Sequence, residues 1–220
     1  SNFVVNTLVH FFLVTGEYNI PALFSTLLLF LAAVLLYIIY RLPGHHIQKN
    51  RYYWLVLSLV FLYLSADEAL AIHERLNKIK DVLGVNLKRY ITSTWILPYA
   101  FFVFTGLLFF IPFFRSLPVK TRKLFIISGS IYIGGSLFLE LFESRMKVLN
   151  GGVTPLYFVF CSVEEFLEMT GIILFLYALL DFMSPYNPWV LIQQTKVSSI
   201  LEKTSNKLVQ EPPSTVDYSA

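Results

Sequence analysis

Five long apolar runs restrict the fold of this chain more than any other feature of its sequence. A helix needs about 20 mostly apolar residues to cross the hydrocarbon layer of a membrane. Hydrophobic residues make up 56% of the chain and charged residues only 14%, against about 25% charged residues in ordinary soluble domains. The sequence therefore predicts an all-α fold, a polytopic membrane helical bundle with about five transmembrane helices. We expect the spans at residues 18–40, 52–66, 90–114, 124–139 and 148–180, the last with an acidic interruption.

The runs divide the chain into three regions. Residues 1–17 are predicted to form an extracytoplasmic interfacial segment, because their apolar part is too short to span. Residues 18–183 hold the five-span transmembrane domain. Residues 184–220 are predicted to form a cytoplasmic tail, which is partly amphipathic and then disordered.

The basic residues indicate how the bundle is oriented. Residues 1–40 contain no lysine or arginine, whereas the loop after the first span holds Arg41, Lys49 and Arg51. Basic loops stay in the cytoplasm, so we expect the N-terminus outside and the C-terminus in the cytoplasm. The loop at 75–89 also carries five basic residues, which weighs against this orientation. The net charge of +3 comes from such loops, so we expect contact with membrane lipids and no nucleic acid. A bacterial inner membrane or a thylakoid-type membrane is the expected location.

Acidic residues interrupt three of the spans at one depth. A helix rises 1.5 Å per residue, so Asp67 and Glu68 lie about 22–24 Å into the second span, within a layer about 30 Å thick. Glu140 lies about 24 Å into the fourth span. The fifth span runs the opposite way, and the three glutamates of residues 164–168 lie about 14–20 Å from its outer end. We therefore expect these acids to meet in the outer half of the bilayer.

A carboxylate in the middle of a bilayer costs roughly 2.5–3.5 kcal/mol on insertion scales, so several of them need compensation. We predict that a bound cation, a metal ion or protons, supplies it. The predicted site consists of Asp67, Glu68, His73, Glu140, Glu143, Glu164, Glu165 and Glu168, with Glu74 at its margin. Asp67, Glu68, Glu140, Glu165 and Glu168 are its expected core. His73 is expected further out, because five residues separate it from Glu68 and turn it to another side of the helix.

The types of ligand in the predicted site do not identify the ion. Carboxylates suit Mn²⁺, Ca²⁺ or Mg²⁺, and carboxylates with a histidine suit Fe²⁺ or Zn²⁺. Crowded carboxylates can instead share protons, with no metal bound. A third alternative treats Asp67 and Glu68 as a helix end that water solvates. The standard di-iron bundle needs a Glu-x-x-His motif on two helices, and the sequence has none.

Helical spacing predicts which side chains act together, since residues three or four apart share a face. Glu140 and Glu143 fall on one face of the fourth span, and Cys161, Glu165 and Glu168 on one face of the fifth. Cys161 is the single cysteine, so the chain has no internal disulfide and no CxxC motif. Its sequence context assigns it no further chemistry.

Small residues in the fourth span predict close packing. Ser130 and Gly134 have the small-xxx-small spacing that lets two helices approach each other. We expect this surface to contact another helix of the same chain rather than a second copy.

Four motifs resemble an uncharacterised family of bacterial multi-span membrane proteins. They are "GEYNIPALFS" at 16–25, "LSADEALAIHE" at 64–74, "LELF" at 139–142 after a glycine-rich helix, and "VEEFLEMTG" at 163–171. The resemblance covers residues 16 to about 182. It implies the architecture and carries no activity.

Three functions fit these observations. The leading hypothesis is a membrane protein with a carboxylate-rich cation site in the outer half of the bilayer. One alternative is an accessory or structural subunit of a larger membrane complex, or a homo-oligomer, whose partner neutralises the acids. The other is a metal-dependent enzyme that acts on a lipid or an isoprenoid, with catalytic residues that the sequence does not identify.

Overall fold

The computed structural model describes residues 19–42, 47, 49–83 and 92–186 of the 220-residue chain. The chain divides after Phe182 into two units, and every contact discussed below lies within the first. All regular elements in the described residues are helices, as predicted. The predicted interfacial segment at 1–17 lies outside the described residues. Of the predicted tail at 184–220, the structure describes only a short 3-10 helix, η3 (Ser184–Tyr186).

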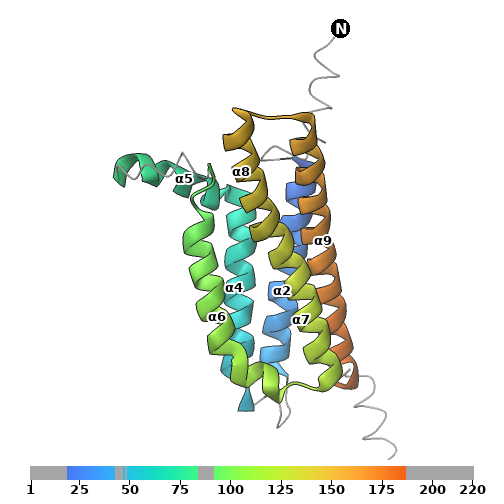
Figure 1. Ribbon diagram of the computed structural model, residues 1–220. Coiled ribbons are helices and arrows are strands. Elements are labelled where there is room, and N and C mark those ends of the chain that lie inside the picture. The colour runs from blue at the N-terminus through green and yellow to red at the C-terminus, as the bar shows by residue number, and fades with distance from the viewer. Residues whose placement is uncertain (1–18, 43–46, 48, 84–91, 187–220) are drawn as a thin grey trace, which may run out of the picture. The chain divides into compact units, whose positions relative to one another are not determined.

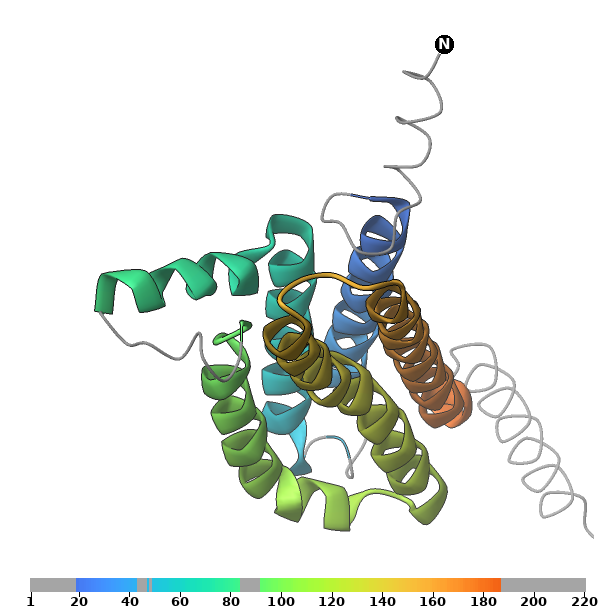
Figure 2. The same ribbon diagram turned by 45° about the horizontal axis from the view of Figure 1, so that its top comes forward.

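Five helical segments are long and apolar enough to cross a membrane, which is the composition of an integral membrane protein. Three of them are α2 (Ile20–Arg41), α4 (Arg51–Leu70) and α6 (Ile96–Ser116). The fourth is continuous but changes its winding, from α7 (Val119–Ile133) through the π-helix η2 (Gly134–Leu139) to α8 (Glu140–Asn150). The fifth begins with α9 (Pro155–Met183). Figure 1 and Figure 2 show these segments side by side.

Several helix ends differ from those predicted, and each has a local cause. α4 runs to Leu70 rather than 66, so Asp67 and Glu68 lie inside a helix. The fourth span continues to Asn150 rather than 139, because helical hydrogen bonding does not require apolar side chains. Gly151 ends it at a φ of 66°, a left-handed conformation that glycine adopts without steric cost. α9 begins at Pro155 rather than 148, and proline favours the first position of a helix.

Hydroxyl groups join α2 to α4. Ser58 donates a hydrogen bond to the carbonyl oxygen of Ala33 at 2.9 Å. Ser65 donates one to the carbonyl oxygen of Thr26 at 3.0 Å. Side chain to backbone bonds between helices require a close approach, and the small residues Ala32 and Ala33 on α2 are fully buried there. These two helices therefore form one wall of the bundle.

Glycines allow α9 to approach the fourth span closely. A Cβ atom added to Gly171 would lie 2.8 Å from the backbone nitrogen of Tyr132, and one added to Gly135 would lie 3.1 Å from the carbonyl oxygen of Glu164. The first distance is shorter than real Cβ atoms show, and the second is tighter than most Cβ contacts. The fourth span therefore packs closely against α9 at Gly135 and Gly171, and not at Gly134 as predicted. Gly134 has nothing within 4 Å of such a Cβ atom.

Aromatic side chains fill the end of the bundle where α4 begins and α6 ends. Trp54 is buried, with its ring centroid 4.9 Å from that of Phe113 and 4.9 Å from that of Phe182. Phe175 stacks on Phe61 at 4.6 Å and contacts Phe125 at 4.7 Å. This packing holds α4, α6, α7 and α9 together at the end opposite the predicted acidic site.

A break at Ala71 separates α4 from α5 (Ile72–Leu83). Ala71 has a φ of 49°, and it is the one residue other than glycine with a positive φ in the described part of the chain. A single left-handed residue redirects the backbone, and α5 accordingly turns away from the direction of α4 (Figures 1 and 2). His73 and Glu74 thereby leave the helix that carries Asp67.

Candidate cation site

A cavity of about 1720 Å³ lies among α4, α5, α6, α7, α8 and α9. α4 and α8 end, and α6 and α9 begin, at the same end of the bundle (Figure 1). This arrangement brings together the acids that the sequence places near those helix ends. The cavity is lined by Asp67, Glu68, His73, Glu74, Glu140, Glu143, Glu164, Glu165 and Glu168. Every residue of the predicted site thus faces one space, although the residues do not form one group.

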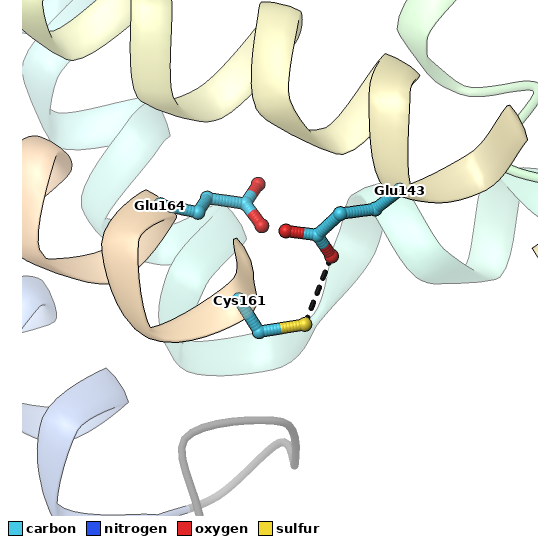
Figure 3. Close-up of side chains that lie close together, drawn as sticks. All are labelled: Glu143, Cys161 and Glu164. Carbon is cyan, nitrogen blue, oxygen red and sulfur yellow. Dashed lines mark hydrogen bonds between the residues drawn. The ribbon is translucent and has the colours of Figure 1, made fainter. Parts of the chain in front are cut away.

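Among the described residues, three side chains of metal-binding type come together as the Glu–Cys–Glu cluster, which we define as Glu143, Cys161 and Glu164. One ligand atom from each lies within 4.8 Å of the other two. Figure 3 shows the carboxyl groups of Glu143 and Glu164 pointing toward each other, with the sulfur of Cys161 beside them. The cluster therefore joins α8 to α9.

Local structure explains how the cluster forms. Cys161 and Glu164 are three residues apart on α9, so they share one face of that helix. The π-helix η2 precedes α8 and sets the rotation of Glu143 about its helix axis. The close approach of η2 to α9 at Gly135 brings the two faces within reach.

Hydrogen bonding leaves one oxygen atom of the cluster unsatisfied. The thiol of Cys161 donates a hydrogen bond to Oε2 of Glu143, with sulfur and oxygen 2.9 Å apart. Oε1 of Glu143 is buried and has no hydrogen-bond partner of standard geometry among the residues that the structure describes. The whole side chain is only 1% exposed. A buried carboxylate oxygen without a partner is costly, and this one faces the carboxyl group of Glu164.

Neighbouring side chains surround the cluster on the cavity side. Glu140 lies one turn before Glu143 and close to both Ser93 and Lys147. The ammonium group of Lys147 lies 4.4 Å above the ring of Tyr157, which is itself buried beside Cys161. One cation therefore lies near several acids at this end of the cavity.

The segment before α6 is fixed to α8 next to the cluster. Oγ of Ser144 accepts hydrogen bonds from the backbone N–H groups of Thr92 and Ser93, at 2.6 Å and 2.9 Å. Ser144 is fully buried and follows Glu143 directly. This contact keeps the start of α6 beside the acidic end of the cavity.

Asp67 belongs to a second group of polar residues. Its Oδ1 accepts a hydrogen bond from the backbone N–H of His73 at 2.8 Å. Its Oδ2 accepts one from the hydroxyl of Tyr99 at 2.9 Å and lies 3.3 Å from Nδ1 of His73. The hydroxyl of Tyr99 also lies 2.8 Å from that of Tyr63, and the ring of His73 packs on that of Trp95. Both oxygens of Asp67 are thus engaged in holding α5 and α6 to α4.

The structure groups the acids of the predicted site differently from the expectation based on the sequence. Glu143 and Glu164, which were expected behind the core, form the cluster together with Cys161. Glu68, Glu165 and Glu168 line the cavity outside the cluster. Sequence reasoning gave Cys161 no role because it is the only cysteine. Its spacing of three residues from Glu164 was the available signal.

A family model described as Domain of unknown function (DUF8692) matches residues 4–182. Comparisons with curated proteins and with solved structures give no match. The matched region ends at residue 182, where the first unit also ends. It therefore contains the whole lining of the cavity.

Proposed function

The chain belongs to the family described as Domain of unknown function (DUF8692), and we propose that it binds a divalent metal ion at Glu143, Cys161 and Glu164 within its bundle. The buried Oε1 of Glu143 carries this proposal, because it faces Glu164 and has no hydrogen-bond partner of standard geometry in the described part of the chain. A metal ion between the two carboxylates would give that oxygen a partner. It would also offset the cost of burying two acids in a membrane.

The donor set narrows the choice of ion. Ca²⁺ and Mg²⁺ take oxygen ligands, whereas a thiolate suits Zn²⁺ and iron. Cysteine and glutamate bind Zn²⁺ at about 2.0–2.3 Å, which puts the donor atoms of a tetrahedral site roughly 3.3–3.8 Å apart. The three donor atoms here lie within 4.8 Å of one another. Small side-chain movements would therefore close the site, and we propose Zn²⁺ or Fe²⁺ as the ion.

The site would keep a position open toward the cavity. Zinc sites that perform chemistry have three protein ligands and a fourth position for water or a substrate. The cluster supplies three donors, and all three residues line the cavity. In a bacterial inner membrane or a thylakoid-type membrane, the distribution of basic residues would put this end of the bundle in the outer half of the bilayer.

Elemental analysis of the purified full-length protein tests the proposal. We expect about one zinc or iron atom per chain in the wild type, and loss of most of it in Glu143→Gln and in Cys161→Ser. Glu168→Gln is the matched control, since Glu168 lines the same cavity on α9 but lies outside the cluster. It should keep the metal.

Two results would contradict this site. A wild type without metal above background would mean that Glu143 and Glu164 share a proton, so the cation would be H⁺. Loss of metal in Glu168→Gln as complete as in Glu143→Gln would place the ion among other acids of the cavity.

A further inference from the structure

The cavity extends well beyond the acidic cluster. Glu164 and Phe175 both line it, and they are eleven residues apart on α9, a distance of about 16 Å along a helix. Its volume of about 1720 Å³ exceeds the roughly 300–1,000 Å³ of pockets that hold drug-sized ligands. The space is therefore long enough for a molecule much larger than a metal ion and its water.

Between the acids and the opposite end of the cavity, large apolar side chains form much of the wall. Its walls there include Leu107, Phe110, Phe114, Phe125 and Phe175, from α6, α7 and α9. Water does not fill an apolar space of this kind stably. The helices around it are those that cross the membrane, where the surrounding solvent is hydrocarbon. A hydrocarbon chain is the occupant that matches these walls.

Carboxyl groups crowd the other end. Among the described residues, eight acidic side chains line the cavity, at Asp67, Glu68, Glu74, Glu140, Glu143, Glu164, Glu165 and Glu168, with His73 and Lys147 as the basic groups beside them. Carboxyl oxygens accept hydrogen bonds whether the groups are ionised or share protons. This end therefore suits a head group that donates hydrogen bonds better than an anionic one. Arg115 and Arg122 line the cavity near the opposite end, where α6 ends and α7 begins.

We propose that the cavity binds a single-chain amphiphile, a long-chain amine or alcohol, with its head group among the carboxylates and its chain along the aromatic wall. This goes beyond the proposed metal site and does not depend on a bound metal, because carboxyl oxygens outside the Glu–Cys–Glu cluster line that end in either case. The amphiphile enters from the bilayer and lies with its head group next to the Glu–Cys–Glu cluster.

Two glycines provide positions at which a larger side chain would occupy part of the cavity. Gly106 on α6 and Gly129 on α7 both line the cavity, and a Cβ atom added to either would meet nothing within 4 Å. Gly106→Leu and Gly129→Leu therefore place a side chain in the space that the hydrocarbon chain needs. Ala100→Leu places the same leucine side chain at an exposed position of α6 outside the cavity, so it is the matched control.

Native mass spectrometry of the full-length protein in detergent measures the binding. Hexadecylamine, hexadecanol and hexadecyl phosphate are added separately to the wild type and to each variant. We expect the amine, the alcohol or both to bind the wild type at least about tenfold more tightly than the phosphate. Gly106→Leu and Gly129→Leu should weaken that binding by about tenfold or more, and Ala100→Leu should leave it unchanged.

Hexadecyl phosphate that binds as tightly as the other two would overturn the proposal, and would instead place an anionic head group at the arginines. Equal binding by the wild type and both cavity variants would also overturn it. Metal content is measured on the same samples. Because neither Gly106 nor Gly129 belongs to the cluster, loss of amphiphile with retained metal separates this result from the metal site.

Discussion

The backbone N–H of His73 donates a hydrogen bond of 2.8 Å to Oδ1 of Asp67, although the two residues lie in different helices. Ala71 lies between them in the left-handed conformation and brings the chain back toward α4. Asp67 therefore acts as a cap for the first turn of α5 from the preceding helix. This capping role gives a structural explanation for an aspartate deep in an apolar span. The sequence alone indicated a ligand-binding role for it.

Substitution of Asp67 should separate its structural role from the metal site. Asp67→Ala removes the cap of α5 and the acceptor of the Tyr99 hydroxyl, which should lower the free energy of unfolding by about 2–4 kcal/mol. Asp67→Asn keeps an oxygen that can accept from His73, so it should lose about half as much. Denaturation in mixed micelles measures both. Metal content should be unchanged in both variants, and its loss would show that Asp67 belongs to the metal site.

Removal of the Ser144 hydroxyl should destabilise the protein. In Ser144→Ala the backbone N–H groups of Thr92 and Ser93 lose a buried acceptor, and we expect the free energy of unfolding to fall by about 1–3 kcal/mol. Ser162→Ala is the control, because its hydroxyl is exposed and bonds within its own helix. It should change stability by less than about 0.5 kcal/mol. Equal effects of the two variants would refute the role given to Ser144.

The contact between α9 and α7 should tolerate no side chain at Gly171. In Gly171→Ala the new methyl group would lie 2.8 Å from the backbone nitrogen of Tyr132, so we expect a loss of about 1–3 kcal/mol of stability. Gly129→Ala has open space and should gain up to about 1 kcal/mol from the higher helix propensity of alanine. Thermal unfolding in detergent compares them, and a stable Gly171→Ala variant would mean that the two helices lie further apart.

Metal binding should release protons. A thiol and carboxyl groups bind a metal in their deprotonated forms, so zinc affinity should fall as the pH is lowered. The Cys161→Ser variant lacks the thiol proton that now bonds to Glu143, and it should bind zinc more than about tenfold more weakly. Titration with zinc in a weakly buffered solution, read with a pH indicator, gives the number of protons released. A wild type that releases none would be inconsistent with a thiolate ligand.

Hydropathy and helical rise, which are local properties, were sufficient to predict the five spans and that their acids line one space. Each span forms its hydrogen bonds within itself, so its approximate position follows from its own residues. The helix ends were less predictable. Asp67 and Glu68 continue α4, and Glu140 and Glu143 continue the fourth span. Hydropathy does not mark these ends, because helical hydrogen bonding does not require apolar side chains.

The sequence by itself determined that this chain forms a helical membrane bundle whose acids gather at one end. Only the tertiary structure decided which of them meet. The π-helix η2 changes the rotation of Glu143, and the approach of α9 at Gly135 and Gly171 turns Cys161 and Glu164 toward it. Rotation about a helix axis depends on packing against neighbouring helices, which residue spacing within one helix does not specify. For that reason Cys161, assigned no chemistry from the sequence, lies at the centre of the candidate site.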